Sequence, residues 1–178
     1  MTKYVAFLRG IGPSNPNMHG SKLVGVLEDQ GFQNVRSFIS SGNVLFETDR
    51  SDIKVMETEL ETAWPKKLGF NSTTFIRSQA ELKKLLAADS FKGLDHNHKS
   101  YLLVTFFKNK PKLNFILPYR VPEKPYELLE QLDNSVSGVV DISTGKTPDY
   151  MVWLERQFGK EITSRTIQTI RRILQKMA

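Results

Sequence analysis

The chain has 178 residues, of which 39% are hydrophobic, and it contains no cysteine. This composition excludes disulfides, thiolate catalysis and zinc sites built on cysteine, and the chain is too apolar to be disordered. The net charge of +6 is uneven, because residues 90–178 hold 14 basic and 9 acidic residues whereas residues 1–89 hold 11 and 10. Such an excess can attract polyanions, and it also favours solubility.

Hydropathy gives no sign of a membrane span. The longest apolar run, residues 101–107, has the length of a strand, whereas a spanning helix needs roughly 18 residues. A strand pattern begins within the first residues after Met1, which leaves no room for a signal peptide. We therefore expect a cytoplasmic protein with no membrane partner. The sequence leaves the oligomeric state open.

The first half alternates strand and helix patterns. We expect a strand over 3–9, an irregular loop over 10–17, a helix with Met18, Leu23, Val26 and Leu27 on one face and Gly31 at its end, strands over 34–40 and 43–47, a helix over 53–64 and a strand over 72–77. Gly42 supplies the positive φ of the turn between the paired strands. Ser51 or Asp52 caps the second helix, and Pro65 kinks or ends it. This order is that of a ferredoxin-like unit, with both helices on one face of an antiparallel sheet.

The second half gives a weaker copy of the same order. Ser78 and Glu81 form a capping box before a short helix. The polar stretch 89–99 predicts a connector between a first unit, 1–88, and a second unit, 100–178. In the second unit we expect strands over 100–107, 126–132 and 136–142, a helix from Thr147-Pro148 to Gly159, and a last helix after Thr163-Ser164 with the stripe Ile167, Ile170, Ile173, Leu174 and Met177.

Two segments of the second unit allow alternatives. Residues 126–132 also fit a helix, although their place in the order favours a strand, and a short helix is possible around Leu113–Leu117. A helix stands where the final strand would be expected. The predicted fold class is α+β, with two ferredoxin-like (βαββαβ-type) units that have antiparallel sheets, the second one degenerate, plus a C-terminal helix.

Three motifs resemble a known family. They are Phe7-Leu8-Arg9-Gly10-Ile11-Gly12, Gly31-Phe32-Gln33-Asn34-Val35-Arg36 and Ser41-Gly42-Asn43-Val44-Leu45-Phe46. In this order and spacing they resemble the bacterial family called domain of unknown function 1697. The resemblance implies two ferredoxin-like units and no established activity. The chain departs from the family pattern at Gly12, where relatives usually have Asn, and at 163–167, which keeps only the Thr and Arg of a T-T-R-N-W segment.

The loop after the first strand is the main candidate binding site. Residues 10–12 connect a strand to a helix, where backbone N–H groups and the helix dipole can hold an anion. Arg9, and Arg165 if the units pack closely, would add guanidinium groups, while Ser41 and Asn43 would present hydroxyl and amide groups. Each feature also has a simpler interpretation. Residues 10–12 would form a flexible turn, the two arginines would form surface ion pairs, and Ser41 and Asn43 would belong to a hairpin turn. The tentative ligand-binding set is Arg9, Gly10, Gly12, Ser41, Asn43 and Arg165.

Other chemistries have less support in the sequence. His96 and His98, with Asp95, have a spacing that binds metal on a strand, but this stretch predicts a loop, so we expect no metal and no cofactor. The glutamates at positions 57, 59 and 61 predict a solvated helix face. No catalytic motif is visible, which leaves open whether the protein is an enzyme.

A ferredoxin-like sheet can bind RNA when aromatic side chains on its strands are exposed. Here Phe7, Phe46, Phe75, Phe106 and Phe107 have apolar neighbours that predict core positions, and the RNP motif is missing. Three functions therefore remain. We favour a small binding module for an anionic ligand or a protein partner. The others are a nucleic-acid-binding protein that uses the basic C-terminal half and an enzyme acting on phosphorylated or carboxylated small molecules.

Overall fold

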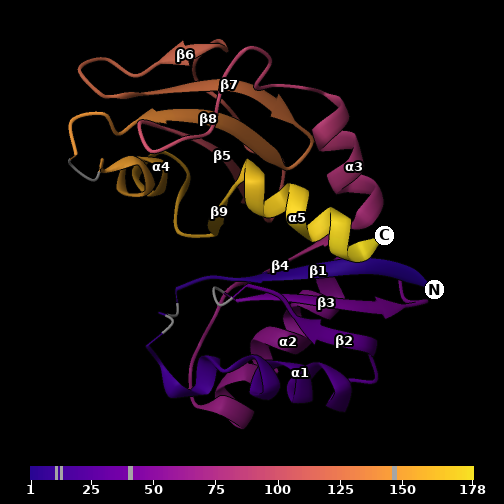
Figure 1. The fold of residues 1–178 in the computed structure, drawn as a ribbon. Coiled ribbons are helices and arrows are strands. Elements are labelled where there is room, and N and C mark those ends of the chain that lie inside the picture. Colours follow the sequence, from indigo (N-terminus) through magenta and orange to yellow (C-terminus); the bar gives the residue numbers. More distant parts are fainter. Residues whose placement is uncertain (11, 13, 40–41, 146–147) are drawn as a thin grey trace. The chain divides into compact units, whose positions relative to one another are not determined.

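A computed structural model describes the chain except for residues 11, 13, 40–41 and 146–147. The chain divides into two units, one made of Met1–Lys83 with Lys176–Ala178 and the other of Lys84–Gln175. Each unit is built on one antiparallel sheet, so the fold is α+β (Figure 1). Within the described residues, no helix is both long and apolar enough to cross a membrane.

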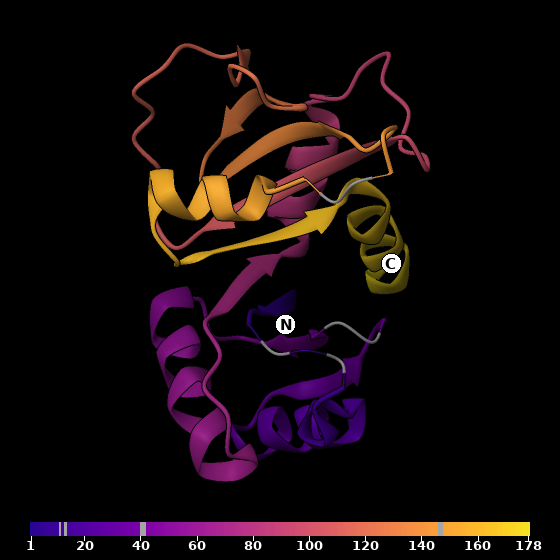
Figure 2. The same cartoon turned by 90° about the vertical axis from the view of Figure 1, so that its left-hand side faces the viewer.

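The first unit has a complete ferredoxin-like arrangement. Its elements are β1 (Thr2–Leu8), the short 3-10 helix η1 (Pro16–Met18), α1 (Gly20–Asp29), β2 (Gln33–Ser37), β3 (Asn43–Thr48), α2 (Ile53–Leu68), β4 (Thr74–Ser78) and the start of α3 (Gln79–Ala87). The strands lie in the order β2-β3-β1-β4 and all pairs are antiparallel. Helices α1 and α2 cover one face of this sheet (Figures 1 and 2). The predicted order is confirmed.

The core of the first unit follows from strand alternation and helix periodicity. Tyr4, Ala6 and Leu8 point from β1 to the face that the helices cover, because successive side chains of a strand alternate. They pack with the apolar stripes of α1 and α2, which include Leu27 and Leu60. The Trp64 indole N–H donates to Thr74 Oγ1 at 2.8 Å inside this core, so its polar atom is satisfied.

Two predicted boundaries of the first unit need correction. Helix α2 does not end at Trp64 but continues through Pro65 to Leu68. Pro65 removes one backbone donor, and the left-handed Gly69, with φ of 73°, ends the helix one turn later. Asp52 caps the start by accepting a bond from Val55 N at 3.1 Å, as predicted. The loop expected to be wholly irregular contains η1.

The second unit repeats the arrangement without its first helix. Its elements are the rest of α3, β5 (Ser100–Phe107), β6 (Tyr119–Arg120), β7 (Tyr126–Leu132), β8 (Ser135–Asp141), α4 (Tyr150–Phe158), β9 (Ile162–Thr166) and α5 (Ile167–Met177) up to Gln175. The strand order is β6-β7-β8-β5-β9. Residues 126–132 form a strand as favoured, whereas the possible helix around 113–117 is absent from this fully described stretch. Instead, Phe115 and Tyr119 pack against the core there, and their stacked rings have centroids 4.3 Å apart.

The end of the chain differs from the prediction. Ile162–Thr166 forms β9, which pairs with β5, so the second unit does have its final strand. Helix α5 begins only at Ile167, where Thr166 Oγ1 accepts a bond from Thr169 N at 3.2 Å. Helix α4 begins at Tyr150 with Asp149 as its N-cap residue, later than the predicted Thr147-Pro148, and Thr147 lies outside the described residues.

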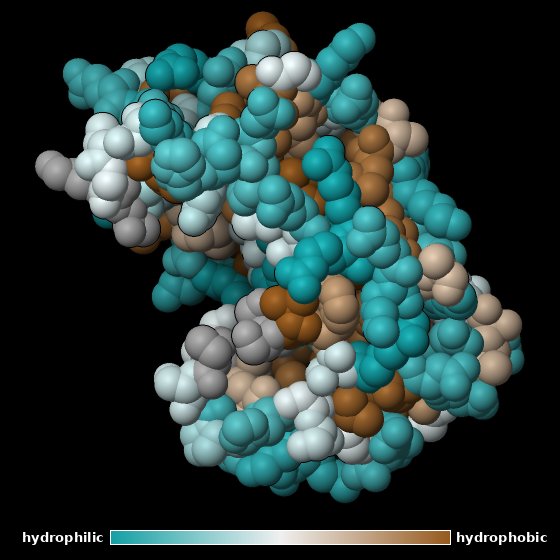
Figure 3. Space-filling view, viewed as in Figure 1, coloured by the Kyte–Doolittle hydropathy of each residue, from teal (hydrophilic) through white to brown (hydrophobic). Residues whose placement is uncertain are grey.

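The five strand phenylalanines singled out in the sequence are core residues. Their exposed fractions are 0% for Phe7, 1% for Phe46, 0% for Phe75, 1% for Phe106 and 4% for Phe107. Their rings are therefore unable to stack on bases in this conformation. The face drawn in Figure 3 is mostly hydrophilic, and hydrophobic side chains appear there in smaller groups.

Candidate functional site

The backbone of Arg9 is held firmly where β1 ends. Its N–H donates to the Thr73 carbonyl at 3.0 Å and to Ser72 Oγ at 3.0 Å, while the Ser72 hydroxyl donates to the Arg9 carbonyl at 2.7 Å. Gly10 follows with φ of 81°. Because glycine adopts this angle without a steric penalty, the chain can leave the sheet directly after Arg9.

Arg9 and Gly10 line a pocket of about 340 Å³ within the first unit, which we call the Arg9 pocket. Its lining residues are Arg9, Gly10, Glu61, Asn71, Ser72 and Thr73. They bring a guanidinium, a carboxylate, an amide and two hydroxyls to one place. Arg9 and Glu61 are half-buried and Asn71 is exposed. Two of the residues proposed from the sequence thus meet in one cleft.

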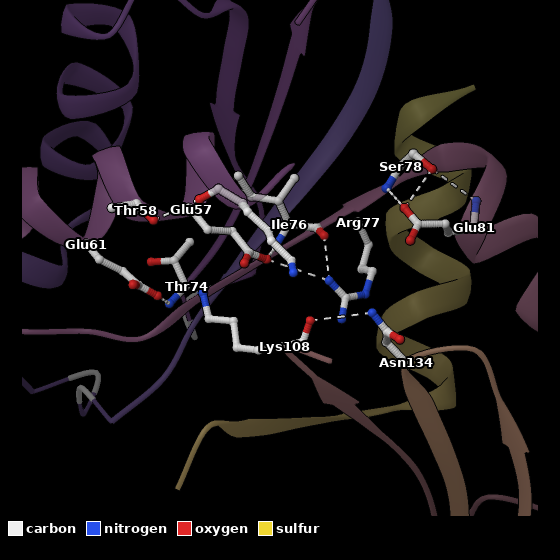
Figure 4. Close-up of polar contacts among 11 residues, drawn as sticks. Glu57, Thr58, Glu61, Thr74, Ile76, Arg77, Ser78, Glu81, Lys108 and Asn134 are labelled. Atoms are coloured by element: carbon white, nitrogen blue, oxygen red, sulfur yellow. Dashed lines mark hydrogen bonds and ion pairs between the residues drawn. The ribbon is translucent and has the colours of Figure 1, made fainter. Parts of the chain in front are cut away.

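Three glutamates hold the outer edge of β4 (Figure 4). Glu61 Oε1 accepts a bond from Thr74 N at 2.8 Å, and Glu57 Oε1 accepts one from Ile76 N at 2.8 Å. Glu81 Oε2 accepts a third from Ser78 N at 2.7 Å, which confirms the capping box. The opposite edge of β4 pairs with β1. Side-chain carboxylates therefore take the place of a neighbouring strand, which protects the edge from pairing with another chain.

This arrangement corrects the prediction of a solvated acidic face. Glu57 is only 4% exposed, and its carboxylate lies 3.7 Å from Arg77 Nη1. Arg77 Nη1 also donates to the Ile76 carbonyl at 2.7 Å. Burial lowers the pKa of Arg77, while the nearby carboxylates of Glu81 and Glu57 raise it. Of the three acidic residues on α2, Glu59 alone behaves as predicted, in a half-exposed ion pair with Arg50.

Asn43 belongs to a different pocket. It is 1% exposed at the start of β3 and lines a cleft of about 160 Å³ together with Gly42, Ser37, Ile39, Met18, Gly20 and Leu23. Gly42 has φ of 70°, as its predicted turn position requires. A Cβ there would also lie 3.0 Å from Leu8 Cβ, so a side chain at this position would require its neighbours to shift. Ser41 lies outside the described residues.

The other proposed residues do not join the Arg9 pocket lining. Gly12 is not among the residues that line either of these two clefts. Arg165 lies in β9 of the second unit rather than at the start of the last helix. Its Nη1 donates to Thr163 Oγ1 at 2.8 Å and to the Ser164 carbonyl at 2.9 Å. Burial lowers the pKa of Arg165 to about 10, so it remains a cation at neutral pH.

Comparison with known families settles the relationship suggested by the three motifs. Residues 1–135 match the model of a family described as "Protein of unknown function (DUF1697)". The chain belongs to the DUF1697 family. This match covers the first unit except for Lys176–Ala178, and the second unit as far as the start of β8. No curated protein matches the chain.

A solved structure supports the same fold for this DUF1697 chain. The conserved bacterial protein SP0830 from Streptococcus pneumoniae superposes with a TM-score of 0.67 at 20% sequence identity, and the alignment covers 99% of each chain. At this identity the likeness concerns the fold alone. The shared fold extends over both units of the chain.

The second unit of this DUF1697 chain has a basic pocket that the sequence indicated only as a charge excess. Lys108, Lys110 and Lys112 line a cleft of about 320 Å³ just after β5, opposite Gln157 and Glu161. They lie in the bend and irregular chain that follow β5, and the cleft brings all three together. Three lysines and one glutamate among the described lining residues give the cleft a net positive charge, which favours an anionic occupant.

His96, one of the two histidines with metal-binding spacing, takes part in contacts that stabilise the fold. His96 Nδ1 accepts a bond from Leu102 N at 3.0 Å, and its ring stacks on Tyr101 at 5.1 Å. Burial lowers the pKa of His96, and the positive charge of Arg171 lowers it further. Among the described residues, no three His, Cys, Asp or Glu side chains come together in a metal-binding group.

Proposed function

We propose that this chain is a small binding module that takes an anionic small molecule in the Arg9 pocket. The observation that carries the proposal is the common lining of this pocket by Arg9 and by residues 71–73, all of which have polar side chains. A guanidinium offers several N–H donors in a fixed plane, which suits a carboxylate or a phosphate. The backbone of Arg9 is anchored at both its N–H and its carbonyl, so the side chain starts from a defined position.

Glu61 narrows the class of ligand. It lines the same pocket and would repel a ligand that has only negative charge, although Arg9 compensates for this. A carboxylate accepts hydrogen bonds only. The best ligand therefore combines an acid group, which faces Arg9, with a hydroxyl or amino donor, which faces Glu61.

A matched pair of small acids tests both the binding of an acid group at Arg9 and the preference for a hydrogen-bond donor at Glu61. Malate and succinate differ by one hydroxyl, and phosphate adds a third acid; each is compared with sodium chloride of equal ionic strength in thermal unfolding. We expect stabilisation by several degrees when the ligand greatly exceeds its Kd, with malate stronger than succinate. Glu61→Gln should remove the difference between the two, because its amide oxygen can still accept the Thr74 bond while the charge is lost.

Arg9→Ala should abolish the stabilisation by all three acids. Arg156→Ala is the matched control, because Arg156 is exposed in the second unit and its loss changes the net charge equally. Equal stabilisation of both variants, or no stabilisation of the wild type, would remove the proposed site. Turnover of a bound acid would instead make the pocket an active site.

The basic pocket favours a second candidate function, binding of a nucleic acid. Phosphate contacts with Lys108, Lys110 and Lys112 would act without base stacking, since the strand phenylalanines are buried. Fluorescence anisotropy with a single-stranded oligonucleotide should then show affinity that falls steeply with salt, by about 0.7 in the logarithmic slope per phosphate contact. Lys110→Ala with Lys112→Ala should weaken binding, and the exposed pair Lys54→Ala with Lys66→Ala should not. If the two double variants bind the oligonucleotide with equal affinity, this function is contradicted.

A further inference from the structure

The second unit contains a larger, mostly apolar pocket that lies at neither of these sites. Its volume is about 460 Å³, which is in the range of small-molecule sites, about 300–1,000 Å³. Tyr101 and Leu103 contribute from β5, Val140 from the end of β8, and Met151 and Val152 from the first turn of α4. We call this cleft the α4 pocket. Its walls come from three elements of one unit, so it forms within that unit.

Hydrogen bonds fix the chain around this pocket. Ile142 N donates to the Lys99 carbonyl at 2.8 Å, which ties the end of β8 to the segment before β5. Gly145 N donates to the Ile142 carbonyl at 3.0 Å and closes a turn at the pocket's edge. The Lys124 ammonium and the Tyr126 hydroxyl both bind the carboxylate of Asp149, at 2.7 Å and 3.1 Å. The cleft thus has a hydrogen-bonded rim.

The walls expose apolar surface that the fold itself does not cover. Tyr101 is 42% exposed and Val152 is 48% exposed, and both are among the few large hydrophobic residues at the surface of the described chain. Leu103 and Met151 are only half-buried although they point into a core-like cluster. Burial of such surface by an apolar body would be favourable, at about 25 cal/mol per Å².

The polar groups of the lining indicate the charge of the occupant. Asp149 is the charged side chain that lines the pocket among its described residues, and His98 and Tyr101 also line it with side chains that can form hydrogen bonds. Lys124 holds one of the Asp149 oxygens but does not itself line the cleft. Among the described lining residues an anion would therefore meet the Asp149 carboxylate and no cation, whereas an ammonium group would be attracted by this carboxylate and by the face of Tyr101.

We propose that the α4 pocket binds a small molecule with an apolar, preferably aromatic, body and a protonated amine, with the amine directed to Asp149. This site differs from the Arg9 pocket in its unit, its lining and the charge that it selects. The inference does not depend on the proposed anion binding.

Three probes of nearly equal size test the charge preference. They are 2-naphthylmethylamine, 2-naphthalenemethanol and 2-naphthoate, and their dissociation constants are measured by isothermal titration calorimetry at pH 7. We expect the amine to bind about tenfold or more tightly than the alcohol, which corresponds to one charge-assisted hydrogen bond. The carboxylate should bind most weakly. Absence of binding by the amine, or tighter binding by the carboxylate, would overturn the proposal.

Variants of the rim locate the binding in this pocket. Val152→Trp should fill the cleft and abolish amine binding, while Val55→Trp, on an equally exposed helix position of the first unit, should leave it unchanged. Asp149→Asn should bring the amine to the affinity of the alcohol. Lys124→Met should strengthen amine binding, because the Asp149 charge is then uncompensated. Unchanged affinity in Val152→Trp would show that the probe binds elsewhere and would refute the site.

Discussion

The hydroxyl of Ser72 both accepts a hydrogen bond from the backbone N–H of Arg9, at 3.0 Å, and donates one to the backbone carbonyl of the same residue, at 2.7 Å. Ser72 is 6% exposed, so these bonds are shielded from water. One side chain thus joins the end of β1 to the segment that leads into β4. The contact fixes the residue from which the proposed anion ligand would be held.

Replacement of this hydroxyl has a predictable cost. Ser72→Ala leaves the Arg9 carbonyl without its Ser72 donor, so we expect a loss of about 1–3 kcal/mol in the free energy of unfolding. Denaturation by urea measures the change. Ser51→Ala, at an exposed position before α2, should change stability by no more than about 0.5 kcal/mol. Equal effects of the two substitutions would show that the Ser72 contact contributes nothing.

The first unit illustrates what local sequence patterns can predict. The stripe of α2, the Gly42 turn and the Asp52 cap depend on residues close together in the chain, and all of them are confirmed. The first helical stripe is confirmed for Leu23, Val26 and Leu27, whereas Met18 lies in η1 and not in α1. Strand β9 was missed because Thr163 and Ser164 resemble a helix cap. Its strand state depends on pairing with β5, more than fifty residues earlier, where Thr105 lies opposite Ser164.

The candidate site likewise combines residues with a local sequence signal and residues whose role depends on distant parts of the chain. Arg9 and Gly10 were found because a strand that ends in a glycine loop is a local signal. Glu57 and Glu61 were missed because the alternation of 57, 59 and 61 suggested divergent directions. Their separation of four residues does place them on one side of α2, next to the buried stripe of Met56 and Leu60, but only the position of β4 gives them donors to bind.

The buried Glu57 should be far more sensitive than its neighbour on the same helix. Glu57→Gln keeps an acceptor for Ile76 N but leaves Arg77 without that counter-charge, which costs on the order of 3 kcal/mol for a buried pair. Glu59→Gln, in a half-exposed pair with Arg50, should cost less than about 1 kcal/mol. Urea unfolding compares the two.

A second substitution distinguishes loss of charge from general disruption. Arg77→Met in the Glu57→Gln background removes the buried cation that has lost the Glu57 charge, so part of the lost stability should return. If the double variant is less stable than Glu57→Gln alone, the Arg77 charge is not the cause of the cost.

Gly42 is constrained both by its backbone angle and by its neighbours. Its φ is 70°, and an added Cβ would meet Leu8 Cβ at 3.0 Å and Met18 Cε at 3.2 Å. Gly69 has a similar φ of 73° but open space around it. Both alanine substitutions should cost about 1–2 kcal/mol for the left-handed angle, and Gly42→Ala should cost at least about 1 kcal/mol more because of overpacking. Equal thermal stability of the two variants would show that the turn can shift and relieve the contacts of the added Cβ with Leu8 and Met18.

The Lys124–Asp149 pair should make stability depend on pH in the acid range. The hydrogen bond from Lys124, followed by that from Tyr126, lowers the pKa of Asp149 below its ordinary value. A carboxyl whose pKa is lowered by folding adds stability above its unfolded pKa, about 3.9, and this contribution is lost as the pH falls through the folded pKa. Wild type should therefore be more stable than Lys124→Met at pH 7, and the difference should shrink below about pH 4.

Urea unfolding at several pH values between neutrality and the acid range measures this difference. Lys92→Met, an exposed control in the same unit, should show a difference from wild type that does not follow the titration of Asp149. High salt should reduce the Lys124 effect at pH 7, because the pair is partly exposed and its charges are screened. A Lys124→Met difference that stays constant from neutral to acid pH would mean that this ion pair does not stabilise the folded state, and the rim of the α4 pocket would then depend on the Tyr126–Asp149 bond and on backbone bonds.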